Sequence, residues 1–137
     1  MTIEDLIAEF EELGDWESRC DYLIDMGGDL PEMPDELKTE ANRVHGCQSN
    51  VWIVAKVGET ADRTIELIAD SDAMIVKGLL AVVLLAYNGR SAREILDTDI
   101  QAIFAKLGLN RHLGMARRNG LAGMVKRVRA FAAEALA

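Results

Sequence analysis

The sequence predicts an α+β fold in which a small antiparallel sheet of about three strands packs against helices from both ends of the chain. Three observations lead to this prediction. Apolar residues recur at helical spacing over residues 2–13 and again over residues 115–135. Between them, residues 64–69 alternate with the period of two that is typical of a strand. The apolar run 79–87 is far shorter than the roughly 20 residues that span a bilayer, so it indicates a buried helix.

The first two elements are predicted to be helices, over residues 2–13 and 16–26. Thr2 and Asp5 form an imperfect capping box at the first helix, and Gly27-Gly28 ends the second. A loop over 30–34 and a single helical turn over 35–39 are expected to follow. Each helix has one apolar face: Leu6, Phe10 and Leu13 on the first, and Trp16, Cys20, Leu23 and Ile24 on the second.

The middle of the chain is predicted to form the sheet. Residues 42–45 and 51–57 are strand-like, residues 58–62 have the composition of a turn, and residues 64–69 alternate. In that last strand, Ile65, Leu67 and Ala69 are expected to face the core, and Thr64, Glu66 and Ile68 the other side. Cys47 then falls in the connection between the first two strands.

The second half of the chain is predicted to be helical. Asp70-Ser71-Asp72 offers acidic capping for the helix 73–87, which is apolar on most sides and is therefore expected to be the core. Ser91 caps a short helix to Leu96, and another helix spans 99–107. The last helix, 115–135, is expected to be interrupted near Asn119-Gly120. Without repeats or linkers, the chain is expected to be one domain, residues 1–137.

Composition and charge narrow the function classes. Half of the 137 residues are hydrophobic, and the net charge of −8 argues against a nucleic-acid binder. Residues 1–40 carry 14 acids and 2 bases, whereas residues 100–137 carry 7 bases and 1 acid. This asymmetry predicts an acidic and a basic face, or two ends that pack together, although solvated helix faces account for most such charges.

The cysteine count and the N-terminus indicate the compartment. No basic stretch followed by an apolar one begins the chain, so no signal peptide is expected, and no apolar run is long enough for a membrane span. Two cysteines without a cysteine-rich framework point to the reducing cytoplasm. We therefore expect a cytoplasmic protein without a membrane partner.

One thiol lies in a segment that favours chemistry, Gly46-Cys47-Gln48-Ser49-Asn50-Val51-Trp52. A glycine before the thiol gives the backbone freedom, and Gln-Ser-Asn is typical of a loop. We therefore expect Cys47 to lie where another molecule can reach it. An unpaired cysteine is more often a small buried hydrophobe, and this interpretation suits Cys20, which shares a helix face with Trp16.

Other chemistries have weaker support in the sequence. Structural zinc needs four ligands of the nitrogen or sulfur class, and the chain has four only if Cys20, His45, Cys47 and His112 are all used. A thioredoxin-type site lacks its second cysteine at close spacing. A Cys–His hydrolase would depend on His112 alone. The pair Arg117-Arg118 is most simply a surface charge pair, but an arginine beside a thiolate would lower its pKa.

Several segments together resemble the SufE family of sulfur-acceptor proteins in iron–sulfur cluster assembly. They keep the order and spacing of the family from residue 16 to about 130. The Gly-Cys-Gln-Ser and Ser-Asp-Ala…Val-Lys-Gly-Leu segments are specific in combination. The matching segments are Trp16-Glu17-Ser18-Arg19, Tyr22-Leu23-Ile24, Gly27, Leu30-Pro31, Asn42, Val44, Gly46-Cys47-Gln48-Ser49, Val51-Trp52, Asp70-Ser71-Asp72-Ala73, Ile75-Val76-Lys77-Gly78-Leu79, His112-Leu113, Arg117, Gly120-Leu121 and Met124.

The resemblance implies a fold shared with IscU-type scaffold proteins and partnership with a SufS-type, pyridoxal-phosphate cysteine desulfurase. It implies that Cys47 is the persulfide carrier and that Arg117 lies close to it. No cofactor is expected, and the protein would be an accessory acceptor that stimulates the desulfurase and passes sulfur to a downstream iron–sulfur scaffold. Association into a weak homodimer is left as an alternative to a monomer. The chain departs from the family pattern at His45, where glutamine is common, at 114–116, where proline is frequent, and at the additional Arg118.

Three other functions remain as alternatives at this level. A scaffold that holds an iron–sulfur cluster or zinc would need three or four thiolate-class ligands. A Cys-dependent hydrolase would turn over an ester or peptide without any partner. An acceptor that feeds tRNA or cofactor thiolation would use the same sulfur-transfer chemistry as a SufE-family protein and would differ only in the destination of the sulfur.

Overall fold

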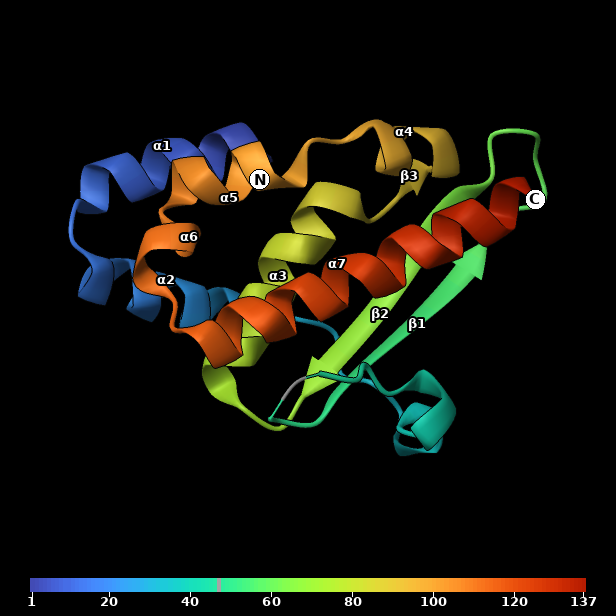
Figure 1. Cartoon of the computed structure of the whole chain (residues 1–137), viewed down its shortest axis with the longest axis horizontal. Coiled ribbons are helices and arrows are strands. Elements are labelled where there is room, and N and C mark those ends of the chain that lie inside the picture. The colour runs from blue at the N-terminus through green and yellow to red at the C-terminus, as the bar shows by residue number, and fades with distance from the viewer. Residues whose placement is uncertain (47) are drawn as a thin grey trace.

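The computed structural model describes residues 1–46 and 48–137 (Figure 1). These residues form an α+β structure with a three-stranded sheet, as the sequence predicts. The helices are α1 (Ile3–Leu13), α2 (Trp16–Gly28), α3 (Met74–Tyr87), α4 (Ala92–Asp97), α5 (Ile100–Leu107), α6 (Leu109–His112) and α7 (Met115–Leu136). The strands are β1 (Val51–Val57), β2 (Thr64–Ser71) and β3 (Arg90–Ser91), and two 3₁₀ turns are η1 (Asp35–Leu37) and η2 (Glu40–Asn42).

The sheet is antiparallel, with the order β1-β2-β3. Its alternation follows the prediction: Ile65, Leu67 and Ala69 of β2 are at most 5% exposed, whereas Ile68 is 39% exposed. The inner face of the sheet packs against α3 and α7, so the period of two in the sequence reports a sheet that is covered on one side.

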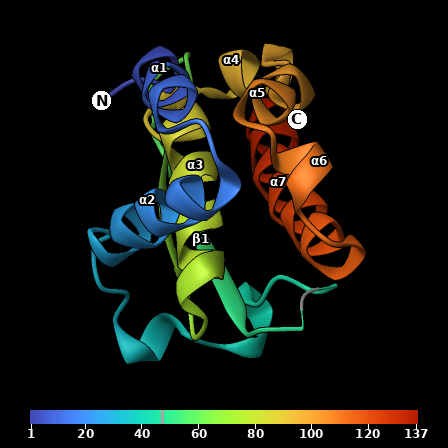
Figure 2. The same ribbon diagram turned by 90° about the vertical axis from the view of Figure 1, so that its left-hand side faces the viewer.

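The helix α3 is the centre of the core, as predicted for residues 73–87. Ten of its 14 residues are buried, from Val76 to Tyr87. In Figure 2 it runs through the middle of the molecule, with α2 on one side and α7 on the other. A helix that is apolar on most sides needs cover on most sides, and α2, α7 and the sheet supply it.

Leu84→Ala is expected to lower the free energy of unfolding by about 2–5 kcal/mol, the usual range for a buried leucine. Leu84 lies in the last turns of α3 and is 8% exposed, so the truncation removes buried apolar contacts. Urea denaturation followed by circular dichroism measures the effect. An unchanged midpoint would mean that this part of α3 is not core.

Two glycines let α2 and α3 cross at backbone contact. A Cβ atom on Gly78 would lie 2.5 Å from the carbonyl oxygen of Leu23, and one on Gly27 would lie 2.6 Å from the amide nitrogen of Gly78. Real Cβ atoms essentially never come so close to backbone atoms. The sequence analysis predicted that Gly27, together with Gly28, ends the second helix. The helix does end at Gly28, but the main role of Gly27 is to allow this crossing.

The predicted strand over 42–45 is wrong. Residues 40–42 form the 3₁₀ turn η2, and only Arg43 makes an isolated bridge, to Trp52. The third strand is β3, whose two residues pair with Thr64 and Ile65 of β2. A strand this short is made by its partner rather than by its own pattern, so a local reading assigned Ser91 to helix capping alone.

The predicted interruption of the last helix is also wrong. The helix α7 is continuous from Met115 to Leu136. A glycine inside a helix costs only about 1 kcal/mol, and burial of Gly120, Leu121 and Met124 outweighs it. The sequence reading did not include α6, a single turn between α5 and α7.

The acidic triplet before α3 does not cap that helix. Asp70 and Ser71 are the buried end of β2, and the N-cap of α3 is Ala73, which makes no side-chain capping bond. The Asp70 carboxylate instead lies 3.3 Å from the Lys38 ammonium and 3.6 Å from that of Lys77. The strand runs further than predicted, so these residues serve the sheet rather than the helix.

The charge asymmetry of the sequence separates in space. The acid-rich helix α2 and the base-rich helix α7 lie on opposite sides of α3 (Figure 2). None of the helices formed by residues 1–46 and 48–137 is both long enough and apolar enough to cross a membrane.

Candidate functional site

The residues before Cys47 are attached to the first strand of the sheet. On its N-terminal side, the amide of Val44 donates to the carbonyl oxygen of Val51 at 2.8 Å, and Arg43 bridges to Trp52. Val44 is buried at 3% exposure. The segment therefore starts from a fixed point beside β1.

A second attachment holds the C-terminal side of this segment. The Asp72 carboxylate accepts hydrogen bonds from the backbone amide of Asn50 at 3.1 Å and from its side-chain amide at 2.9 Å. Asp72 also donates its own backbone amide to the carbonyl oxygen of Asn50 at 3.3 Å. Three bonds thus join the end of the segment to the junction between β2 and α3.

The residues on both sides of Cys47 adopt loop conformations. Gly46 has φ +92°, a left-handed conformation that favours glycine. Gln48 is exposed and Ser49 is half-buried. Cys47, the predicted persulfide acceptor, lies outside the described residues, so its expected position stays a prediction.

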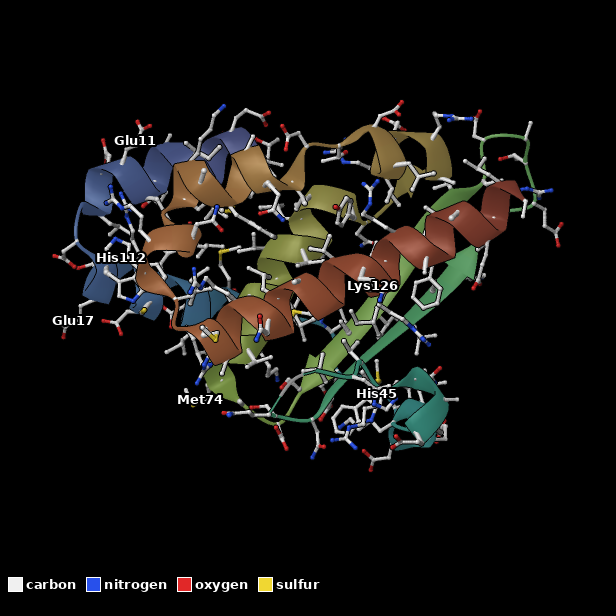
Figure 3. The ribbon with its side chains drawn as sticks, viewed as in Figure 1. Glu11, Glu17, His45, Met74, His112 and Lys126 are labelled. Carbon is white, nitrogen blue, oxygen red and sulfur yellow. The ribbon has the colours of Figure 1, made fainter. Side chains whose placement is uncertain are left out.

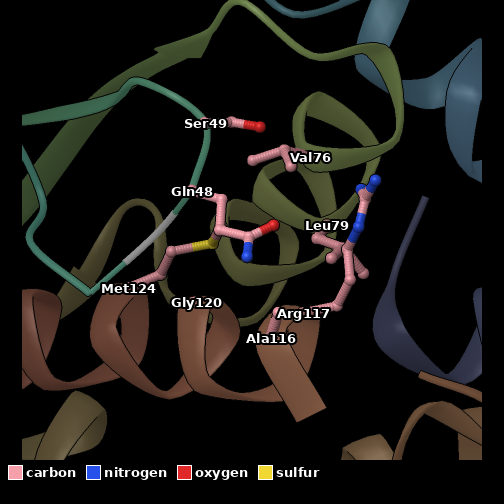
Figure 4. A pocket seen from close by; sticks show the side chains of 8 residues that line it. All are labelled: Gln48, Ser49, Val76, Leu79, Ala116, Arg117, Gly120 and Met124. Atoms are coloured by element: carbon pink, nitrogen blue, oxygen red, sulfur yellow. The ribbon is translucent and has the colours of Figure 1, made fainter. Parts of the chain in front are cut away.

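A small cavity opens beside Gln48 and Ser49 (Figure 4). Its volume is about 50 Å³, enough for a water molecule or a single heavy atom. Val76 and Leu79 of α3 line one wall, and α7 supplies the other with Ala116, Arg117, Gly120 and Met124. The two residues that follow Cys47 in the sequence therefore meet the N-terminal halves of two helices.

The electrostatics of this cavity favour an anion. Val76, Ala116 and Arg117 of the lining belong to the first turns of α3 and α7, where the macrodipoles are positive and no acidic residue occurs. The Asp72 carboxylate, just before α3, is bonded to Asn50. Arg117 lines the cavity and adds a full positive charge, whereas Arg118 is not among the lining residues. Of the two arginines considered from the sequence, Arg117 is therefore the one beside the residues that follow Cys47.

The second thiol, Cys20, lies at the edge of the core. Leu23 is fully buried, but Trp16, Cys20 and Ile24 are only half-buried, so the predicted core position of Cys20 is only partly right. Burial raises the pKa of the Cys20 thiol, the nearby Asp21 raises it further, and Arg117 opposes them. Cys20 is therefore a poor thiolate near neutral pH.

We expect Cys20 to alkylate with a pH midpoint above that of free cysteine, which is about 8.5. A raised pKa keeps the thiol protonated to higher pH, so the thiolate fraction at pH 8 is smaller than in a free cysteine. The rate of iodoacetamide modification as a function of pH, measured in the Cys47→Ser variant, gives the midpoint. A midpoint below that of free cysteine would show that Arg117 outweighs burial.

The two histidines, His45 and His112, lie apart from each other and have different neighbours. His112 stacks on Trp16 with ring centroids 4.8 Å apart, and the His45 ring lies 3.7 Å from Glu40. Figure 3 shows these two histidines at well-separated places in the molecule. Among residues 1–46 and 48–137, no group of three or more His, Cys, Asp or Glu could hold a metal ion.

Two features of the site were absent from the sequence reading. The Asn50–Asp72 attachment joins residues 22 positions apart, and no local pattern reveals it. Met74 and Met115, at the starts of α3 and α7, are 67% and 71% exposed. The helical pattern at each position predicted a helix start but not an exposed methionine at both starts.

The model of the SufE family, described as an Fe-S metabolism associated domain, matches residues 4–132. The chain belongs to the SufE family. The resemblance seen in its motifs is thereby confirmed, and the family places the protein in iron–sulfur metabolism.

Two uncharacterized SufE-like proteins are close in sequence to this SufE-family chain. The protein from Rhizobium meliloti is 41% identical over 132 residues, which cover 96% of this chain and 94% of that protein. The protein from Rhizobium etli is 43% identical over 129 residues, which cover 93% and 87%. The similarity therefore extends over nearly the full length of the relatives.

The fold also occurs in a solved structure. The solution structure of a hypothetical protein from Thermus thermophilus matches with a TM-score of 0.76 and 22% identity, over 99% of this chain and 98% of that one. At this identity the match supports the fold, which agrees with the α+β architecture expected of the family.

Proposed function

We propose that this SufE-family protein accepts sulfur on Cys47 from the persulfide of a pyridoxal-phosphate cysteine desulfurase and passes it to iron–sulfur cluster assembly. The observation that carries the proposal is the cavity beside Gln48 and Ser49, with Arg117 and two positive helix ends around it. The chain would act as an accessory acceptor in the cytoplasm, where a free thiol such as Cys47 stays reduced and ready to accept sulfur.

The transfer is a thiol–disulfide-type exchange. The Cys47 thiolate attacks the outer sulfur of the donor persulfide, a new sulfur–sulfur bond forms at Cys47, and the old bond breaks. The donor cysteine leaves as a thiolate with the electron pair of that bond, so no external oxidant or reductant is needed. The second transfer, from Cys47 to a downstream thiol acceptor, repeats the same exchange.

The surroundings of Gln48 and Ser49 suit the charge changes in this step. A thiolate forms before attack, and free cysteine, with a pKa of about 8.5, is only a few per cent ionised at pH 7. The α3 and α7 N-termini and the Arg117 guanidinium stabilise negative charge near the segment. Gly46 and Gln48 are both exposed, so a partner can reach the described residues next to Cys47.

Intact mass spectrometry tests the proposal directly. The purified protein is incubated with a cysteine desulfurase and cysteine, and peptide mapping then locates any added sulfur. We expect one added sulfur atom on Cys47 and none on Cys20. Added sulfur on Cys20, or none on either residue while the desulfurase turns over cysteine, would contradict the assignment.

Arg117→Ala is expected to slow modification of Cys47 more than Arg118→Ala does. Loss of the cavity cation removes stabilisation of the thiolate, and a change of one pKa unit would alter the thiolate fraction by about tenfold. The rate of Cys47 alkylation as a function of pH measures this. The matched control is Arg118→Ala, because Arg118 is an exposed neighbour outside the cavity lining. Equal profiles for both variants would exclude tuning by Arg117.

A further inference from the structure

A groove between the chain before Cys47 and α7 carries basic side chains around a largely apolar floor. Arg43 and His45 come from the segment before Cys47, and Lys126 and Arg127 come from α7, around a volume of about 290 Å³. We call this the Arg43–Lys126 groove. In Figure 3 the labelled His45 and Lys126 lie along the same side of the molecule.

The groove is built where the chain and α7 touch. A Cβ atom on Gly123 would lie 3.0 Å from the carbonyl oxygen of His45, so only a small residue allows this approach. Arg127 fixes the neighbouring chain by donating to the carbonyl oxygen of Ala41 at 2.8 Å, and its guanidinium lies 5.0 Å from the Phe131 ring centroid. Arg127 is thus held against the chain that leads to His45.

The positive charges in the groove are incompletely matched. The carboxylate of Glu40 lies 3.5 Å from Arg43 and 3.7 Å from His45, and it is 72% exposed. Within residues 1–46 and 48–137, no acidic side chain pairs with Lys126 or Arg127. Exposed ion pairs of this kind contribute little, so an incoming carboxylate can replace Glu40 at small cost.

This arrangement is opposite in sign to the protein as a whole. A chain with a net charge of −8 repels an acidic partner on average, and the groove lies beside the base-rich helix α7, where the local charge is of the opposite sign. Electrostatic complementarity of this kind orients an encounter and speeds association more than it adds affinity. The Glu40 carboxylate shows that a carboxylate fits between Arg43 and His45.

We infer that the Arg43–Lys126 groove docks an acidic segment of the sulfur-donating partner, whose carboxylates face Lys126 and Arg127 and take the place of Glu40. The inference rests on the proposed function, because it concerns the same partner. Docking here brings the donor alongside His45 and Gly46, and therefore next to Cys47 in the chain. The groove would then set the orientation of the complex, and the cavity on the α3 side would set the chemistry.

The test compares two charge reversals of equal size. Lys126→Glu changes the groove, and Lys106→Glu changes an exposed lysine of α5, a helix that contributes no residue to the groove lining. Affinity for a cysteine desulfurase is measured by isothermal titration calorimetry at low and moderate salt. We expect Lys126→Glu to weaken binding by about tenfold at low salt, with a reduced salt dependence, and Lys106→Glu to change it by less than about twofold.

A short polyglutamate peptide provides a second measurement that does not depend on the desulfurase. It is expected to shift the amide resonances of residues 43–45 and 123–130 in the wild-type protein, and to shift them less in Lys126→Glu. Glu40→Gln is expected to tighten peptide binding by about twofold to fivefold, because it removes the internal competitor.

The outcomes separate the two proposals. If the wild-type protein takes no sulfur from an active desulfurase, the proposed function fails, and the partner named for the groove fails with it. If the wild-type protein takes sulfur but Lys126→Glu binds the desulfurase as tightly as Lys106→Glu does, the docking inference alone is overturned. Peptide shifts that do not map to the groove also overturn it.

Discussion

Gly78→Ala is expected to lower the free energy of unfolding by about 3 kcal/mol or more, although alanine is the better helix former by about 1 kcal/mol. The added methyl group would lie 2.5 Å from the Leu23 carbonyl oxygen and 2.7 Å from the Leu23 carbonyl carbon. These are backbone atoms of α2, so the whole helix must move to make room. The packing of α2 on α3 would then be lost along the centre of the core.

Gly28→Ala is the matched control for this experiment. Gly28 is likewise a helical glycine, in the last turn of α2, but a Cβ atom there would meet nothing within 4 Å. The same chemical change is therefore expected to leave stability unchanged or to raise it by at most about 1 kcal/mol. Urea denaturation of both variants measures the difference. Equal midpoints for the two would show that α2 and α3 do not cross at backbone contact.

Cys47→Ser is expected to abolish sulfur acceptance and stimulation of the desulfurase while leaving the fold intact. A hydroxyl cannot take the place of the thiolate, because its pKa is far too high for it to attack a persulfide at neutral pH. The residues around it, Gly46 and Gln48, are exposed, so the change is expected to disturb little packing. The rate of alanine formation by the desulfurase, with and without the variant, measures the loss.

Cys20→Ser is the control for the second thiol. Cys20 is half-buried and its pKa is raised, so its loss is expected to leave sulfur acceptance within about twofold of wild type. Thermal unfolding of both variants checks that neither effect comes from instability. If Cys47→Ser still stimulated the desulfurase and Cys20→Ser did not, the result would falsify the assignment of Cys47.

Long, strongly periodic elements were predictable from the sequence, and short ones were not. The stripe of α1, the apolar α3 and the alternation of β2 each carry their burial pattern within a single window of sequence. The two-residue strand β3 depends on pairing with Thr64 and Ile65, which lie more than 20 positions away. Propensity also misled at Asn119-Gly120, where tertiary packing keeps α7 continuous.

The segment that forms the candidate site was predictable from the sequence, but the residues that surround it in the fold were not. The sequence identified Cys47 and Arg117, and it left open which of two adjacent arginines was relevant. The structure brings Arg117 to the cavity beside Gln48, because position 117 lies on the face of α7 that meets α3. The bonds between Asn50 and Asp72 and the basic groove both depend on distant residues that meet only in the folded chain.

The order of the sheet has a consequence for association between copies. The strand β1 is an edge, paired with β2 on one side. On its other side, among the described residues, Arg43 and Val44 pair with the first two residues of the strand, Trp52 and Val51, and the rest of the edge is open. An open edge offers unpaired amide and carbonyl groups to a strand of another molecule, and Val57 at its end is 40% exposed. Lys56 opposes such pairing, because a second copy laid along the edge would have to approach its ammonium group. Lys56 thus disfavours edge-to-edge pairing, and replacing it by an uncharged strand-forming residue is expected to make such pairing easier.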